Sequence, residues 1–107
     1  MPTTIEPQAE LTTLVNVFTV APERQRELVD TLTVATEKLI RHREGFISAN
    51  IHASTDGTRV LNYAQWSDPA AHQAMLDDPE CLDHLAAAAA LATFDPHVYT
   101  VDSVHHA

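Results

Sequence analysis

Cysteine, basic residues and long apolar runs are scarce in this 107-residue chain, and each shortage excludes a class of protein. One cysteine, Cys81, cannot form an internal disulfide, which favours a reducing cytoplasm. Six Lys and Arg against fifteen Asp and Glu give a formal net charge of −9, which argues against a nucleic-acid or anionic-membrane partner. No apolar run is long enough to span a bilayer, and the first residues lack the order of a signal peptide.

Catalytic thiol and metal chemistry are also disfavoured. Cys81 lies in a helical pattern among apolar residues, where a thiol packs rather than reacts. The histidines outside the regions discussed below show no metal-ligand spacing with neighbouring acids: His42, His52, His97, His105 and His106. We therefore expect no metal site.

The chain does have a regular succession of strand and helix patterns. Residues 11–20 alternate with period two and predict a strand, and a helical stripe beginning at Pro22 and ending near Gly45 predicts a helix. Residues 46–53 and 59–66 predict a hairpin whose loop contains Gly57. Two Asp-Pro pairs, at residues 68–69 and 78–79, predict helices ending near residues 77 and 92. Residues 93–104 predict a last strand.

This order determines the expected domain and fold. Residues 1–10 are polar with two prolines and predict a flexible N-terminal arm, and residues 11–107 predict a single domain. The order strand, helix, strand, strand, two helices, strand is the split βαβ pattern of an α+β, ferredoxin-like fold. In that topology the first and third strands are neighbours.

The third predicted strand, Arg59–Trp66, is the most informative segment. Its even-numbered face carries Val60, Asn62, Ala64 and Trp66, whereas an ordinary core strand would carry branched aliphatics there. Asn62 and Trp66 are about 13 Å apart along a strand, which leaves room for a flat, multi-ring ligand. Asn16 can project from the first strand onto the same face. We therefore interpret this face as a pocket wall.

Several motifs together resemble the antibiotic-biosynthesis monooxygenase family, over residues 11–104. The motifs are Val-Asn-Val-Phe-Thr in the first strand, Glu-Gly-Phe before the second, His-Ala-Ser-Thr-Asp-Gly-Thr across the hairpin and Asn-Tyr-Ala-Gln-Trp in the third. The strongest likeness is to small cofactor-free anthrone oxygenases of aromatic polyketide pathways. The resemblance implies a homodimeric α+β barrel that uses O₂ to convert an anthrone-type carbon into a carbonyl without flavin, metal or haem.

The resemblance also implies which residues act. Asn16, Asn62 and Trp66 match polar residues assigned to catalysis, and His84 is the further catalytic candidate because imidazole titrates near neutral pH. Candidates for substrate binding are Phe18, His72 and Tyr63. Some relatives place a tyrosine where this chain has His72 and an arginine near His84, so the proton carrier is open: His84, His72 or a water.

Competing interpretations remain at this stage. The amides and the indole can be ordinary, fully bonded core groups, and His84 can be a packing histidine. A haem-binding or haem-degrading protein of the same fold would use Asn16 and His84. A non-catalytic protein that binds aromatic ligands, or a cyclase using the same enolate without O₂, would also fit the fold.

Overall fold

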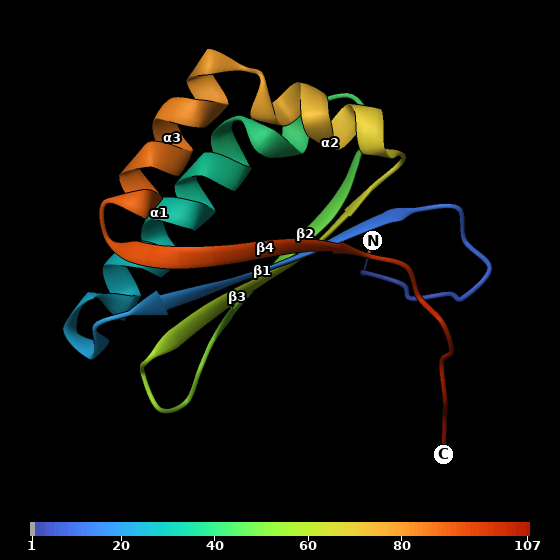
Figure 1. Cartoon of the computed structure of the whole chain (residues 1–107), viewed down its shortest axis with the longest axis horizontal. Helices are drawn as coiled ribbons and strands as arrows, with labels where there is room; N and C mark the ends of the chain where they lie inside the picture. Colours follow the sequence, from blue (N-terminus) through green and yellow to red (C-terminus); the bar gives the residue numbers. More distant parts are fainter. Residues whose placement is uncertain (1) are drawn as a thin grey trace.

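The computed structural model describes residues 2–107 as one sheet with helices on a single face (Figure 1). The elements follow the predicted order. They are β1 Thr12–Val20, η1 Pro22–Arg24, α1 Gln25–Lys38, η2 Ile40–His42, β2 Phe46–Ala53, β3 Arg59–Trp66, α2 Pro69–Leu76, α3 Pro79–Ala89 and β4 Ala92–Tyr99. The predicted α+β, ferredoxin-like fold is confirmed.

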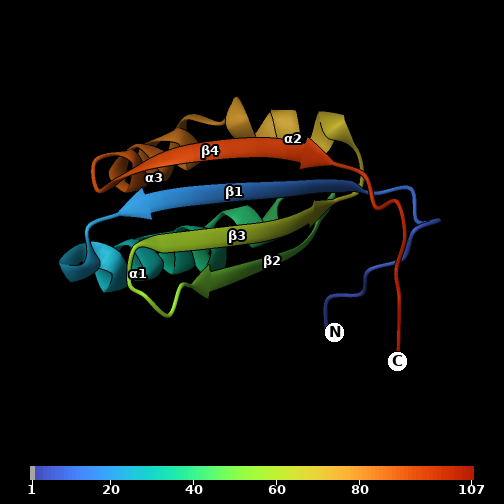
Figure 2. The same cartoon turned by 60° about the horizontal axis from the view of Figure 1, so that its bottom comes forward.

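The four strands form an antiparallel sheet in the order β2-β3-β1-β4, which Figure 2 shows from the sheet side. The central pair is β1 and β3, as the split βαβ pattern predicts. In their register Asn16 lies directly opposite Asn62. The two amides that the sequence placed on one face are therefore cross-strand neighbours, with side chains about 5 Å apart at Cβ.

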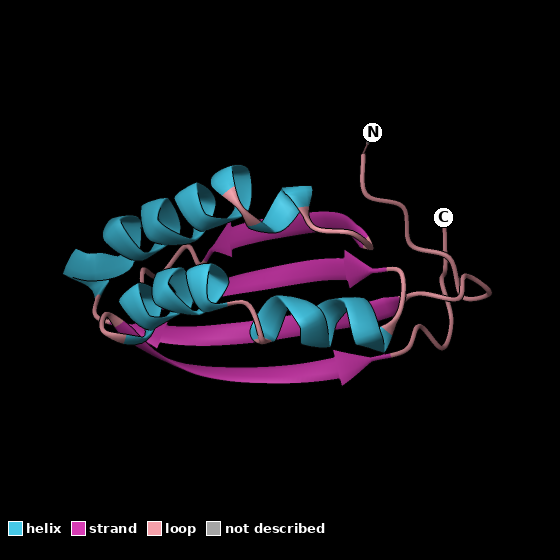
Figure 3. Ribbon diagram, turned by 90° about the horizontal axis from the view of Figure 1, so that it is seen from above, coloured by secondary structure: helices cyan, strands magenta, loops and turns pink. Residues whose placement is uncertain are grey.

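The helices lie across the sheet in two rows, α1 in one and α2 with α3 in the other (Figure 3). Asp68 and Asp78 cap α2 and α3 as predicted, because their carboxylates accept hydrogen bonds of 2.8 Å from the backbone N–H groups of Ala71 and Glu80. Between helices and sheet lie two apolar clusters. One is built around Phe18, Leu28 and Val60, and the other around Leu14, Trp66 and Met75.

Three predicted boundaries are wrong. The first helix ends at Lys38 because Leu39 leaves helical geometry (φ −125°, ψ −59°) and then packs, with Ile40, against the Trp66 cluster. The helix α3 ends at Ala89 instead of residue 92. The last strand ends at Tyr99 instead of residue 104, since Tyr99 already pairs with Thr13 near the start of β1 and later residues have no strand beside them.

Residues 2–11 carry no helix or strand, yet they are hydrogen-bonded to the sheet face that lacks helices. The Thr3 hydroxyl donates to the Asn50 side chain (2.8 Å), and the buried Gln65 amide donates to the Thr4 carbonyl (2.8 Å). The flexibility predicted for residues 1–10 is thus limited by two contacts, and Met1 lies outside the described residues.

Candidate active site

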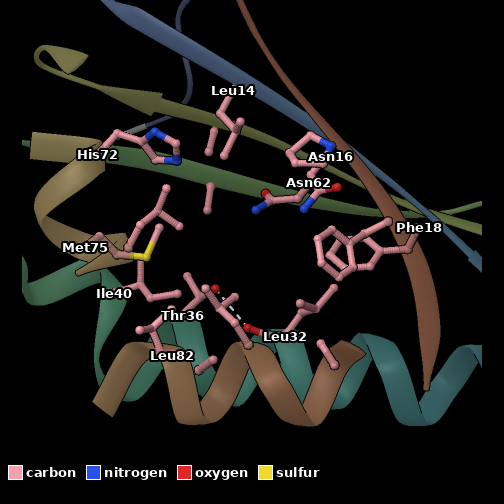
Figure 4. Close-up of a pocket in the computed structure, with 18 of the residues that line it drawn as sticks. Leu14, Asn16, Phe18, Leu32, Thr36, Ile40, Asn62, His72, Met75 and Leu82 are labelled. Carbon is pink, nitrogen blue, oxygen red and sulfur yellow. Dashed lines mark hydrogen bonds between the residues drawn. The ribbon is translucent and has the colours of Figure 1, made fainter. Parts of the chain in front are cut away.

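A cavity of about 650 Å³ lies between the sheet and the helices, with contributions from all four strands (Figure 4). No Asp, Glu, Lys or Arg lines it. Its walls are apolar apart from two asparagines, a threonine, the indole and one imidazole. The lining residues include Asn16, Phe18, Thr36, Phe46, Asn62, Ala64, Trp66, His72, Met75, Leu82, Leu85, Ala86, Ala88, Ala89, Phe94, Pro96 and Val98.

The amide pair is the polar centre of the sheet wall. Asn16 and Asn62 lie side by side, and the Oδ1 atom of each is buried without any hydrogen-bond partner among residues 2–107. A buried acceptor left unpaired costs about 1–3 kcal/mol. Sequence reasoning left open whether these amides are bonded within the core, and the structure answers that their oxygens are not.

Trp66 forms the wall four residues further along β3, beyond Ala64. Only 1% of its surface is exposed, and the edge-to-face contact with Phe46 (ring centroids 5.5 Å apart, 85° between planes) fixes the indole. Its other neighbour is His72, 5.8 Å away between ring centroids. The indole and the imidazole therefore stand together, in a part of the cavity separate from the amide pair.

His72 is half-buried on α2 and lines the cavity. Burial lowers the pKa of its imidazole from the ordinary 6.5, because desolvation disfavours the charged form. The position of α2 depends on Gly45, whose φ of +84° and close approach to Ala71 leave no room for a side chain: an added Cβ would lie 2.4 Å from the Ala71 Cβ. Burial therefore favours the neutral imidazole, and the packing of α2 against Gly45 holds it at the cavity wall.

The structure brings five of the seven predicted site residues to one cavity, namely Asn16, Phe18, Asn62, Trp66 and His72. It does not bring Tyr63 there. Tyr63 follows Asn62 directly, so the alternation of β3 turns it to the opposite face, beside Val15 and Asn50. Its predicted place in the pocket is therefore corrected.

The predicted place of His84 is also corrected. The α3 residues that line the cavity are Leu82, Leu85, Ala86, Ala88 and Ala89, and His84 is not among them. His72, ranked below it from the sequence, is the imidazole that reaches the cavity. Sequence reasoning also missed the cavity residues of α1, such as Thr36, and the row Phe94, Pro96 and Val98, although the period-two pattern of residues 94–98 already places that row on one face.

Two further features are absent from residues 2–107. Within that range no group of three or more His, Cys, Asp or Glu side chains is arranged to hold a metal ion. The same residues contain no helix of the length and hydrophobicity that a membrane crossing requires.

With fold and site in place, comparison with known proteins gives the class of protein. The family model described as "Antibiotic biosynthesis monooxygenase" matches residues 12–87, and the chain belongs to this family. The match includes both strands that carry the amides and the α2 helix that carries His72.

Individual proteins similar to this chain support the family assignment. The chain is 57% identical over 81 residues to tetracenomycin-F1 monooxygenase of Streptomyces glaucescens, covering 76% of this chain and 72% of the relative. It is similar to the ActVA-Orf6 monooxygenase of Streptomyces coelicolor, solved with the ligand nanaomycin D (TM-score 0.81, 31% identity, 95% and 96% of the two chains). It is also similar to SnoaB of Streptomyces nogalater, a cofactor-independent oxygenase (TM-score 0.79, 26% identity, 90% and 97%).

Proposed function

We propose that this protein is a cofactor-independent monooxygenase that oxidises the anthrone-type carbon of an aromatic polyketide to a quinone carbonyl with O₂. The observation that carries the proposal is the pair of unpartnered amide oxygens of Asn16 and Asn62 in an uncharged cavity. A phenolic ring system with a carbonyl can donate a hydrogen bond from its hydroxyl to an amide oxygen and accept one at its carbonyl from an amide N–H₂ group. The sequence relationship to tetracenomycin-F1 monooxygenase supports this substrate class.

The chemistry needs no cofactor because the substrate supplies the electrons. An anthrone methylene that loses a proton becomes a phenolate-like carbanion, which can pass one electron to O₂. The resulting radical and superoxide combine into a peroxide. Protonation of this peroxide and loss of water leave the carbonyl, so that one CH₂ and one O₂ give one C=O and one H₂O. The protein has to bind the substrate, stabilise the oxyanion and move protons.

The cavity residues can be assigned to these tasks. The amide N–H₂ groups of Asn16 and Asn62 are neutral donors that stabilise the oxyanion at the ring carbonyl, and a wall without charges strengthens such hydrogen bonds. Across the central ring from that carbonyl lies the methylene. We assign removal of the methylene proton to His72, because burial lowers the pKa of its imidazole and so favours the neutral form that can accept a proton. Trp66, beside His72, offers a flat surface for stacking.

We include a homodimer in the proposal, as the family resemblance implies. The sheet face opposite the helices carries half-buried apolar side chains, among them Val15, Val17 and Leu61. A second copy of the chain would cover this face and form the α+β barrel. Sedimentation equilibrium should give twice the chain mass, and a monomer at micromolar concentration would contradict this part. The cytoplasmic location remains a prediction from the sequence.

The activity is tested with protein purified in the presence of a metal chelator. Anthrone should be converted to anthraquinone while an oxygen electrode records consumption of one O₂ per product. Asn62→Ala and Trp66→Phe should each lower the rate. If both variants oxidise anthrone at the rate of the unsubstituted protein, the site assignment is wrong. Turnover that depends on added metal or flavin would contradict cofactor independence.

The haem alternative is not supported by the site geometry. It requires Asn16 and His84 to act on one ligand, and only Asn16 lines the cavity. Titration with hemin should therefore give no sharp Soret band. A sharp band that is lost in His84→Ala would support the haem alternative.

A further inference from the structure

The cavity opens to solvent along one side, and the open side is apolar. The exposed lining residues come from α3 and β4 alone. The largest of them are Leu82, Phe94 and Val98, with 45%, 52% and 60% of their surface exposed, and Ala86, Ala89 and Pro96 complete the set. The residues that line the remaining walls are buried or half-buried. We call these six residues the rim.

The rim lies directly beside the amide pair. In the register of β1 and β4, Pro96 is opposite Asn16, and Phe94 is opposite Phe18, with ring centroids 6.1 Å apart. A planar ring system held at Asn16 and Asn62 therefore reaches the rim if it extends across the sheet toward β4. The apolar surface of the rim matches an additional aromatic ring and not a sugar or a charged group.

On the α3 side, two of the three rim residues have small side chains, and the third is Leu82. Ala86 and Ala89 lie one turn apart on the cavity face, whereas Ala87, exposed on the same helix, does not line the cavity. A larger side chain at either position would extend over the opening. The small side chains of Ala86 and Ala89 therefore keep the opening wide.

We propose that the rim holds the terminal ring of the substrate, and that Ala86 and Ala89 determine how many linearly fused rings the protein accepts. This inference rests on the proposed function for its substrate class. Its test does not depend on turnover, because Trp66 is the only tryptophan of the chain and lies in the cavity wall. Ligand binding can thus be followed through tryptophan fluorescence.

The experiment compares Ala86→Leu with Ala87→Leu, which adds the same side chain to the same helix outside the cavity. Each protein is titrated with a tricyclic quinone, anthraquinone, and a tetracyclic one, tetracenequinone, while quenching of Trp66 is recorded. Ala86→Leu should weaken binding of the tetracyclic quinone by about tenfold or more relative to the tricyclic one, since a misplaced methylene in an apolar pocket has an effect of this size. Ala87→Leu should leave both affinities unchanged.

The inference is overturned if Ala86→Leu weakens both quinones equally, or neither, or if Ala87→Leu has the same effect. Ala89→Leu repeats the test from the next turn should Ala86→Leu fail to fold, as judged by circular dichroism. The proposed function fails separately, if the unmodified protein binds the quinones but does not oxidise anthrone. The difference in affinity between the tricyclic and the tetracyclic quinone would then still test whether the rim holds the terminal ring.

Discussion

Replacing Asn62 with leucine should make the protein more stable and nearly inactive. Leucine has the branched shape of asparagine, and it removes an acceptor that is buried without a partner. Removing that unpaired group should raise the free energy of unfolding by about 1–3 kcal/mol. For a domain of this size the melting temperature should rise by roughly 4 °C per kcal/mol.

The same substitution removes one of the two donors assigned to the oxyanion. Loss of such a donor lowers kcat by about 10²–10³-fold. Thermal unfolding followed by circular dichroism gives the stability, and anthrone oxidation gives the activity. The two quantities should move in opposite directions, which is expected of a residue kept for function at a cost in stability.

Asn50→Leu is the matched control, since Asn50 lies on the adjacent strand with its amide bonded. It accepts from the Thr3 hydroxyl (2.8 Å) and donates to the Tyr63 carbonyl (3.0 Å). Its replacement should lower stability by about 0.5–1.5 kcal/mol per lost bond and leave turnover intact. If Asn62→Leu instead destabilises the protein as Asn50→Leu does, the Asn62 amide is bonded in solution and the reasoning fails.

Three further predictions follow from side-chain contacts. Burial lowers the pKa of His72, so the folded protein binds fewer protons than the unfolded chain just below pH 6.5. Stability and kcat/KM should therefore both fall as the pH drops through that region. In His72→Gln the acid limb of the rate profile should disappear, and kcat should be lowered about 10²–10⁴-fold. Asp78→Ala should destabilise the protein by about 1–2 kcal/mol in urea unfolding, because it removes the cap on the Glu80 N–H and the ion-pair partner of Arg43; an unchanged midpoint would contradict the cap. Hydrogen bonds donated by Thr58 and Ser54 lower the pKa of Asp56 to about 2, so its NMR titration should have a midpoint near that value, and a midpoint near 3.8 would show that the hairpin contacts are absent in solution.

Local patterns in the sequence determined most of the secondary structure. Alternation of period two marks β2 and β3 to the residue, and Asp-Pro pairs mark the starts of α2 and α3, because these signals depend only on a residue's immediate neighbours. The same alternation assigns Asn62 and Trp66 to one face. It also excludes Tyr63 from that face, so a motif-based assignment failed where the periodicity gave the correct answer.

Other boundaries depend on partners distant in the chain. The end of β4 is set by where β1 begins, and the break after α1 is set by the packing of Leu39 and Ile40 against the Trp66 cluster. Neither partner can be identified from the neighbouring residues. The contact of the N-terminal segment with Asn50 and Gln65 likewise spans 47 and 61 residues of sequence.

The alternation along the strands is enough to place two amides and an indole on one face of the central strands, because side-chain direction in a strand repeats every second residue. The packing of the helices against the sheet leaves the amide oxygens unpaired and brings His72, and not His84, to the cavity that the amides line. Those facts depend on how α2 and α3 are rotated and how far they stand from the sheet. Packing between elements far apart in the sequence sets that rotation and that distance, and no local pattern encodes either.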